Sequence, residues 1–477
     1  MKDIEIRKEN VGIDNTGTHQ SGLIKKLKHI TIKHLKTTTV QGIPQIFEEE
    51  KYYLKIIWAF AFITSTAYMV YSVYLLISDY NSYPSYTSTF TVQEIPTKFP
   101  AITVCNMKVI NKTKYCTNNL ECILLNPSHN EARMSQYCPS SIHTWNESIR
   151  REFGYRIENM LVSCSFNFKN CTVEDFTHHY DPLRGMCYTF NKGIYNNGSS
   201  YILKTVNANG ANTGLSLEFY IGDSILETQC ELDDGMLISI HNQSLAPFTQ
   251  DNELKCAAGS ETDFIVTRIF ISKLEKPYGN CLKDINSNSK FDSEIFRYIV
   301  QTLNVTYSQK YCFSLCQQRE TMAICNCSNI ELPIFKNGTK YCIPFHDCMV
   351  NVFANFNKTQ SDRCAAECPY ECDSVQYSVT SLSSLYPTPF YLKNVLKSKI
   401  RKHYKKKRDS FARINIYYDK MEYTSTIQSI AVTPQQLIGN IGGCLGLCIG
   451  ISILWVVELL SMLIKLIQTL ISYAKNC

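Results

Sequence analysis

Two long apolar segments near opposite ends of the chain decide what it can fold into. The first runs from Ile56 to Ile77 and carries no charge. It exceeds the roughly 20 residues that a helix needs to cross the hydrocarbon of a bilayer, and such an uncharged run is unusual in a soluble core. The second runs from Leu437 to Ile464 and contains one carboxylate, Glu458. The sequence therefore predicts two membrane-spanning helices.

Cysteine usage indicates the compartment of the segment between them. The chain has 22 cysteines, and all but three lie between Cys105 and Cys372. Reducing compartments keep thiols free, so this density indicates an oxidising, secretory-route environment. The same segment contains Asn-x-Ser/Thr acceptor sites for glycosylation, which support that compartment. These sites are Asn111, Asn146, Asn170, Asn197, Asn242, Asn304, Asn326, Asn337 and Asn357.

The spans and the cysteines together predict a topology in the plasma membrane. No signal peptide precedes the first span, which is therefore expected to act as a signal anchor. Two spans place both ends of the chain on one side, and five lysines between Lys25 and Lys36 agree with cytoplasmic ends. We expect a cytoplasmic N-terminal segment (1–55), a first transmembrane helix (56–78), a cysteine-rich extracellular domain (79–436), a second transmembrane helix (437–464) and a cytoplasmic tail (465–477).

The extracellular domain is predicted to mix helices and strands. Apolar alternation in residues 214–221 and 236–241 predicts strands, and helical spacing in residues 291–304 predicts a helix. The predicted fold class is an α+β membrane protein in which two transmembrane helices flank a large, disulfide-rich domain.

Glycines recur at a helical spacing in the second span. Gly442, Gly446 and Gly450 lie four residues apart, so they would share one face of a continuous helix. Glycines there let helix backbones approach closely in lipid. This pattern alone fits a packing seam and a pore equally well.

Polar positions in the same span favour a cation pathway over a simple seam. Gly450 and Ser452 can offer backbone carbonyls and a hydroxyl to a dehydrated cation. Glu458 lies further in, and an acid within the membrane is costly unless it faces water or a partner. Asn440 lies at the outer mouth on a compatible face. We therefore expect the second span to line a pore.

At these residues the chain resembles the degenerin/epithelial sodium channel family, which includes acid-sensing and peptide-gated channels. The second span is similar to the family's polar outer position, Ile-Gly-Gly, Gly-x-Ser filter and later Glu. Here those are Asn440, residues 441–443, residues 450–452 and Glu458. Further matching segments follow one another in the family's order: residues 99–106, 185–191, 277–281, 307–327 and 363–372.

The resemblance implies a trimeric, sodium-preferring and amiloride-sensitive cation channel, in which Gly450, Ile451 and Ser452 form the selectivity filter. Its partners would be sodium ions and homologous subunits, in homotrimers or heterotrimers. It also implies seven disulfides, which are Cys105–Cys187, Cys164–Cys171, Cys281–Cys372, Cys312–Cys368, Cys316–Cys364, Cys325–Cys348 and Cys327–Cys342.

Five extracellular cysteines stay outside that framework. Cys230 and Cys256 are a candidate extra pair. One of Cys116, Cys122 and Cys138 would remain free or bind another chain, because the number is odd. In the second span, Cys444 and Cys448 are expected to be packed.

Three departures from the family pattern carry expectations of their own. Gln41-Gly42 replaces a His-Gly pair that supports opening, and an amide does not titrate near neutral pH. We therefore expect the subunit to open poorly alone and to work in heterotrimers. Asn440 replaces an acid found in many relatives, which predicts weak block or permeation by calcium. Ile451 is bulkier than the usual filter residue, so the preference for sodium over potassium stays open.

The gating stimulus is predicted to be an extracellular neuropeptide. Residues 81–88, just after the first span, contain no histidine. Single surface histidines are usually inert, and His178, His179 and His241 are treated as such. Proton gating is the alternative, and mechanical or constitutive opening stays possible.

Other classes of protein explain fewer of these features. An ATP-gated receptor needs clustered lysines around a triphosphate and fewer cysteines. A two-span scavenger or adhesion receptor explains the topology but gives Glu458 no role. The chain lacks the His-Glu-x-x-His, Gly-x-Ser-x-Gly and phosphate-loop motifs, so we expect no enzyme, no cofactor and no metal site. A net charge of +6 does not indicate nucleic-acid binding.

Overall fold

The chain folds into two compact units, each described here by itself. One unit combines residues up to Tyr86 with those from Ile430 onward, and the other is Thr87–Ser429. The computed structural model describes residues 16–109, 111, 147–222, 234–247, 253–283, 291–303, 305–335, 340–342, 347–354, 358–396 and 408–476.

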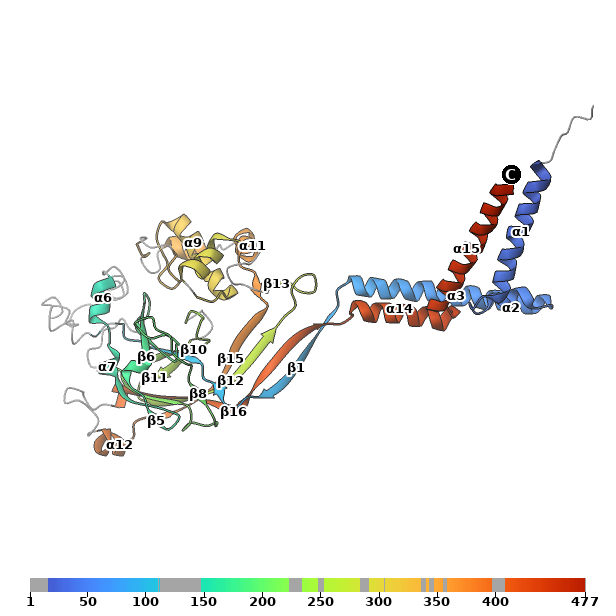
Figure 1. The fold of residues 1–477 in the computed structure, drawn as a ribbon. Helices are drawn as coiled ribbons and strands as arrows, with labels where there is room; N and C mark the ends of the chain where they lie inside the picture. Colours follow the sequence, from blue (N-terminus) through green and yellow to red (C-terminus); the bar gives the residue numbers. More distant parts are fainter. Residues whose placement is uncertain are drawn as a thin grey trace, which may run out of the picture. The chain divides into compact units, whose positions relative to one another are not determined.

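The first unit is helical. Its helices are α1 (Thr16–Thr37), α2 (Ile43–Glu48), α3 (Tyr52–Asn81), α14 (Pro434–Ile449) and α15 (Ile453–Asn476). Two segments, Tyr52–Asn81 and Ile453–Ser472, are long and apolar enough to cross a membrane. The first of them contains the whole of the predicted first span. Within this unit α3 lies along α14, and α15 lies beside α1 (Figure 1).

The helix predicted over 437–464 is divided in two. Thr433 caps the start of α14, because its hydroxyl accepts the Gln436 N–H at 3.2 Å while the Gln436 side chain accepts the Thr433 N–H at 2.8 Å. The helix ends at Ile449, followed by Gly450 in the left-handed conformation. The prediction of one continuous helix is therefore wrong, and residues 450–452 separate α14 from α15.

The second unit is built on two sheets. The larger sheet has the order β15-β12-β16-β9-β4-β5, and β1 also pairs with β16. Only β12 and β16 run parallel among its described pairs. Its strands are β1 (Ser85–Gln93), β4 (Leu161–Phe166), β5 (Lys169–Asn170), β9 (Leu215–Tyr220), β12 (Ser260–Ser272), β15 (Asp373–Leu385) and β16 (Phe411–Ile430).

The smaller sheet has five strands in the order β11-β10-β3-β7-β6. Its strands are β3 (Ala101–Asn106), β6 (Phe176–Asp181), β7 (Gly185–Phe190), β10 (Gly235–His241) and β11 (Leu254–Ala257). Two short ladders pair β2 (Thr97–Lys98) with β8 (Thr205–Val206) and β13 (Cys281–Leu282) with β14 (Tyr370–Glu371).

Side chains from both sheets form the main core. Phe99, just before β3, has its ring centroid 5.0 Å from that of Phe166 and 6.0 Å from that of Tyr418. Strands β3 and β10 are buried along their whole length. The strands predicted over 214–221 and 236–241 are confirmed as β9 and β10.

Helices of the second unit lie at several places around the two sheets and at the cysteine cluster (Figure 1). They are α6 (Glu147–Phe153), α7 (Ile157–Met160), α8 (Glu294–Arg297), α9 (Gln309–Cys325), α10 (Asp347–Ala354), α11 (Lys358–Glu367) and α12 (Pro389–Asn394). The helix predicted over 291–304 is short, because α8 passes into a π-helical turn at Tyr298–Thr302. Helices α9 and α11 lie together near β13 (Figure 1).

Seven disulfides link the described cysteines of this unit. They are Cys105–Cys187, Cys164–Cys171, Cys281–Cys372, Cys312–Cys368, Cys316–Cys364, Cys325–Cys348 and Cys327–Cys342. These are the pairs that the family resemblance implies. Four of them hold the region of α9–α11, and Cys281–Cys372 joins β13 to the chain after β14. Such cross-links limit the entropy of the unfolded chain.

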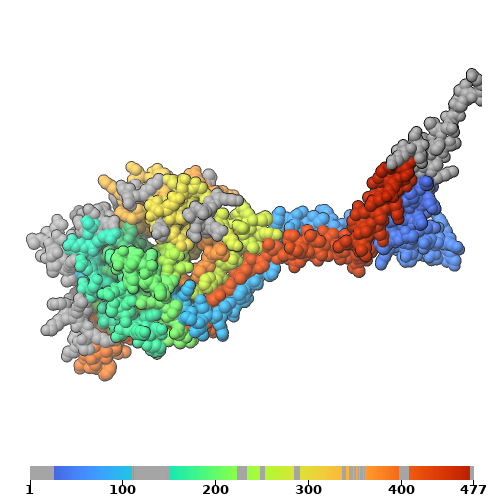
Figure 2. Space-filling view, viewed as in Figure 1, coloured from blue at the N-terminus to red at the C-terminus, as the bar shows by residue number. Residues whose placement is uncertain are grey.

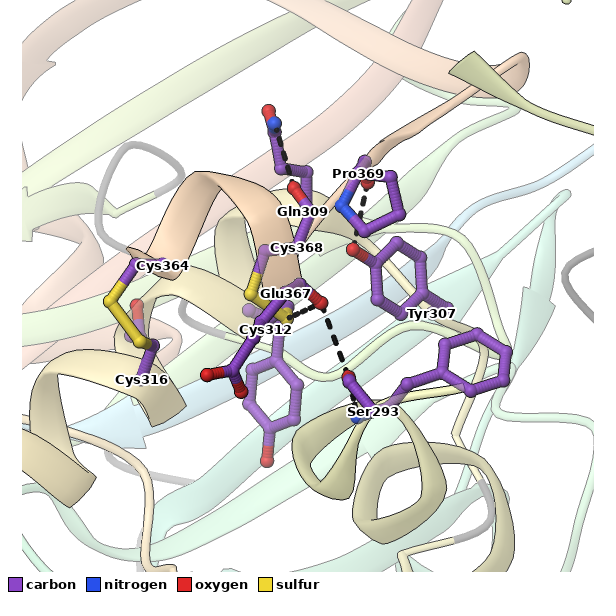
Figure 3. The surroundings of a disulfide bond; sticks show 12 residues. Ser293, Tyr307, Gln309, Cys312, Cys316, Cys364, Glu367, Cys368 and Pro369 are labelled. Carbon is purple, nitrogen blue, oxygen red and sulfur yellow. Dashed lines mark hydrogen bonds between the residues drawn. A yellow bond between two sulfur atoms is a disulfide. The ribbon is translucent and has the colours of Figure 1, made fainter. Parts of the chain in front are cut away.

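Hydrogen bonds surround the two disulfides that join α9 to the α11 end (Figure 3). The Ser293 hydroxyl donates to the Glu367 carbonyl at 3.2 Å, and the Tyr307 hydroxyl donates to the Pro369 carbonyl at 2.7 Å. The Gln309 side chain donates to the Cys368 carbonyl at 3.1 Å. These bonds fix the chain that leaves α11 for β14 against the start of α9.

The candidate pair between Cys230 and Cys256 is wrong, because Cys256 is a free, buried thiol. It lies on β11 with its side chain in the core, and its sulfur contacts the Arg413 carbonyl at 3.5 Å. The strand directs this side chain inward, which the spacing of cysteines could not reveal. Cys116, Cys122, Cys138 and Cys230 lie outside the described residues.

The acceptor asparagines that the structure describes differ in exposure. Asn170, Asn197 and Asn326 are exposed, whereas Asn111 and Asn242 are partly buried. The remaining predicted sites lie outside the described residues, and they are Asn146, Asn304, Asn337 and Asn357.

One histidine is built into the core of the smaller sheet. His241 is 3% exposed. Its Nε2 lies 2.8 Å from the Thr103 hydroxyl, and its Nδ1 lies 2.8 Å from the Asn242 carbonyl. Burial lowers the pKa of His241 from 6.5 to about 3, because the charged ring would lose its hydration.

This burial predicts a loss of stability in acid. The unfolded chain binds a proton at His241 below about pH 6.5, while the folded chain resists it down to about pH 3, so stability falls as the pH falls through that window. Replacing His241 by Gln should reduce the drop between pH 7 and pH 5 by about 2 kcal/mol. Thermal unfolding of the purified protein at both pH values, with exposed His178→Gln as the control, measures this. An identical drop in parent and His241→Gln would contradict it.

Candidate pore-lining site

The break between α14 and α15 is set by Gly450. Its φ is +70°, a region that costs a residue with a side chain about 1–2 kcal/mol. A Cβ added there would lie 2.8 Å from the Cγ atom of Gln41. Conformation and space therefore both require glycine at this point. The spacing predicts that Gly442, Gly446 and Gly450 share one helix face. This prediction is wrong for Gly450, because the helix ends at Ile449.

The segment before the first span folds back onto this break. The Gln41 N–H donates to the Ile449 carbonyl at 3.0 Å. A carbonyl at a helix end lacks an intrahelical donor, and this bond supplies one. Thr38 and Val40 are buried on either side of the exposed Thr39. Residues 38–42 thus lie against the point where α14 stops.

The same segment binds the carboxylate of α15. Both the backbone N–H and the hydroxyl of Thr39 donate to Glu458 Oε2, each at 3.2 Å. Charge-assisted bonds of this kind are about twice as strong as neutral ones. Glu458 therefore has a partner within its own chain.

Glycine is also required at position 42. Gly42 has a φ of +91°, and a Cβ there would lie 3.3 Å from the Phe62 ring. Its N–H donates to the Gln45 side chain at 3.0 Å, which starts α2. The turn at Gly42 lets the chain leave the break and enter α2 and α3.

Helix α3 also contacts the end of α14. The Ser65 hydroxyl donates to the Cys448 carbonyl at 2.6 Å. The last carbonyls of α14 at Cys448 and Ile449 thus receive hydrogen bonds from other segments of the same unit. The space-filling view shows α14 running against α3 (Figure 2).

Asn440 lies on a different face of α14 from the glycines. It lines a cavity of about 620 Å³ between α3 and α14, together with Cys444 and Cys448. Gly442 and Gly446 do not line this cavity. Cys444 and Cys448 therefore face a hollow instead of being packed.

The structure brings together some of the predicted residues and separates others. The contacts given above bring Gln41 and Gly42 to the break at Gly450 and to the segment that binds Glu458. Asn440 lies more than two helical turns before the break, near the start of α14. Ser452 is exposed directly before α15. Sequence analysis missed Thr39 and Ser65, whose partners lie 419 and 383 residues away. A run of three threonines, residues 37–39, was the available signal for the first.

Within the part of the chain that the structure describes, no group of three or more His, Cys, Asp or Glu could hold a metal ion. The hydrogen bonds around the helix break join backbone N–H and hydroxyl donors to carbonyl and carboxylate oxygens.

If the second apolar segment lines a cation pathway, as its residues predict, replacing Gly450 by alanine should abolish most of the current without lowering surface expression. The left-handed conformation and the contact with Gln41 both oppose a Cβ there. Whole-cell current and surface labelling measure this in cells that express the chain together with a homologous subunit. The control is Gly439→Ala, at a position where a Cβ meets no atom within 4 Å. Full current from Gly450→Ala would show that the break does not need glycine.

Comparison with known proteins identifies the family of the chain. A family model described as amiloride-sensitive sodium channel matches residues 34–462. Acid-sensing ion channel 1A of Danio rerio is 27% identical over 463 residues, which cover 91% of this chain and 87% of that protein. Epithelial sodium channel subunit beta-2 of Xenopus laevis is 25% identical over 358 residues, which cover 72% of this chain and 54% of that protein.

The match to a solved structure of a proton-activated chloride channel covers 88% of this chain and 98% of that chain, with 8% identity and a TM-score of 0.31. The family match spans most of the sequence, including α3, the disulfide-rich unit, α14 and the first part of α15. The relatives are channels and not enzymes. The chain belongs to the amiloride-sensitive sodium channel family, the degenerin/epithelial sodium channel family that its motifs resemble.

Proposed function

We propose that this chain is one subunit of a trimeric, sodium-preferring and amiloride-sensitive cation channel in the plasma membrane. Both ends would be cytoplasmic and the disulfide-rich unit extracellular. The observation that carries the proposal is the break at residues 450–452. Non-helical backbone at membrane depth is tolerated where protein covers it or where it lines a water-filled path. Three copies around an axis would supply that path.

The filter would be formed by Gly450, Ile451 and Ser452. Carbonyls of a chain that has left the helix, together with the Ser452 hydroxyl, can replace the hydration shell of a cation. Beside Gly442 a Cβ would meet no atom within 4 Å in one chain. This open face suits close approach by another copy of α14. Glu458 would contribute negative charge further along the path.

Gln41 and Gly42 would serve opening by holding the break. The bond to Ile449 uses the backbone N–H of Gln41, so a change of side chain leaves it in place. The side chain itself packs on Gly450 and cannot titrate near neutral pH. We infer that this subunit opens poorly alone and works in heterotrimers with homologous chains.

An extracellular neuropeptide is the proposed gating stimulus. Burial lowers the pKa of His179 to about 4 and that of His241 to about 3. Neither ring would bind a proton in a mild acid step, so both are poor sensors. Proton gating is the second candidate, because acid-sensing channels are among the relatives.

Co-expression separates these possibilities. The chain is expressed alone and with homologous subunits, and short amidated peptides are compared with steps to acidic pH. We expect a peptide-evoked current only with partner subunits, blocked by amiloride and reversing near the sodium potential. An acid-evoked current favours the second candidate, and a large current from the chain alone contradicts obligate heterotrimers. No current with any partner contradicts the channel assignment.

Replacing Asn440 by Asp should raise block by external calcium at least several-fold. A ring of carboxylates binds a hard divalent cation more strongly than a ring of amides. Calcium inhibition curves on co-expressed channels measure the change. Asn440→Gln, which keeps the amide, is the control. Equal calcium inhibition curves for Asn440→Asp and the parent would contradict the placement of Asn440 at the outer mouth of the pore.

A further inference from the structure

A pair of thiols on α14 faces a cavity that the proposed filter does not use. Cys444 and Cys448 lie four residues apart, so they share one helix face. Both line the cavity of about 620 Å³ beside α3. Both are free and partly exposed.

The walls around these thiols provide oxygen atoms and space. Asn440 lies one turn before Cys444 on the same face, while Ser72 and Asp79 come from α3. Asp79 and Asn440 are both exposed, so polar groups mark the end of the cavity away from the Gly450 break. Among the described residues that line it there is no lysine or arginine. A cation entering the cavity would therefore meet a carboxylate, an amide and then two sulfurs.

This donor set suits a soft cation. Thiolates bind Zn²⁺ and its soft relatives at about 2.3 Å, so two of them on one tetrahedral ion lie about 3.8 Å apart. Residues four apart on a helix have Cβ atoms about 5–6 Å apart, which lets both sulfurs converge on one ion. We propose that Cys444 and Cys448 together bind a soft divalent cation of the Zn²⁺ and Cd²⁺ class, with Asn440 or water completing its shell.

The position of the pair links binding to conduction. Cys448 precedes Gly450 by two residues, and its carbonyl accepts the Ser65 hydroxyl at 2.6 Å. A metal bound to both sulfurs would clamp the last turn of α14 against movement at the break. Occupancy is therefore expected to reduce the current. Binding itself does not depend on which ion the channel carries.

A labelling experiment tests binding apart from conduction. The purified, full-length protein is treated with a small maleimide, with and without Zn²⁺, and labelled cysteines are located by mass spectrometry. We expect labelling of Cys444 and Cys448 in the absence of Zn²⁺ and at least roughly tenfold slower labelling in its presence. Either single replacement, Cys444→Ser or Cys448→Ser, should remove most of the protection at the remaining thiol.

A recording experiment tests the consequence. External Zn²⁺ or Cd²⁺ should inhibit the parent channel, and Cys444→Ser/Cys448→Ser should shift the half-inhibiting concentration at least roughly tenfold. Cys256→Ser is the matched control, since it removes a buried free thiol elsewhere in the chain. Labelling that ignores Zn²⁺, thiols that no maleimide reaches, or equal metal sensitivity in the double variant would each overturn the proposal. A channel that fails to conduct would leave the labelling result to decide it.

Discussion

A helix that ends leaves carbonyl groups without intrahelical donors, and the hydrogen bonds that supply those donors to α14 connect the segments of the helical unit. The carbonyls of Cys448 and Ile449 receive hydrogen bonds from Ser65 and Gln41. The two donors come from α3 and from the segment before it. Without that segment the break at Gly450 would expose polar backbone, so α14 could not end where it does.

The returning segment does more than satisfy one helix end. Thr39 binds the Glu458 carboxylate on α15, while Gln41 binds the end of α14. A short stretch of chain therefore contacts both halves of the second apolar segment. Gly42 turns directly afterwards, and α2 then leads into α3, so this stretch connects α3 to the break. This arrangement gives a physical reason for expecting residues near Gln41 to affect opening.

Elements that depend on nearby residues were predicted from the sequence. The long uncharged segment predicted α3, and the alternation of apolar residues predicted β9 and β10. The family resemblance implied the disulfide pairs. The break was missed because the apolar run continues through residues 450–452, and only the left-handed conformation of Gly450 reveals the end of the helix. The contact between Thr39 and Glu458 spans 419 residues and has no periodic signature. Cys230 was a candidate partner for Cys256, but Cys256 is a free thiol buried in the core.

The two sides of α14 provide different chemistry to cations. On one side a Cβ at Gly442 would meet no atom within 4 Å, and on the other Asn440, Cys444 and Cys448 line the cavity beside α3. Asn440 could therefore act on divalent ions through an outer ring or through the cavity beside α3. The choice of metal ion distinguishes the two routes, because calcium prefers oxygen ligands whereas zinc and cadmium prefer thiolates. If replacing Asn440 changes inhibition by calcium alone, Asn440 acts in a ring of oxygen ligands. If it changes inhibition by zinc and cadmium in the same way as replacing Cys444 and Cys448, Asn440 acts in the cavity.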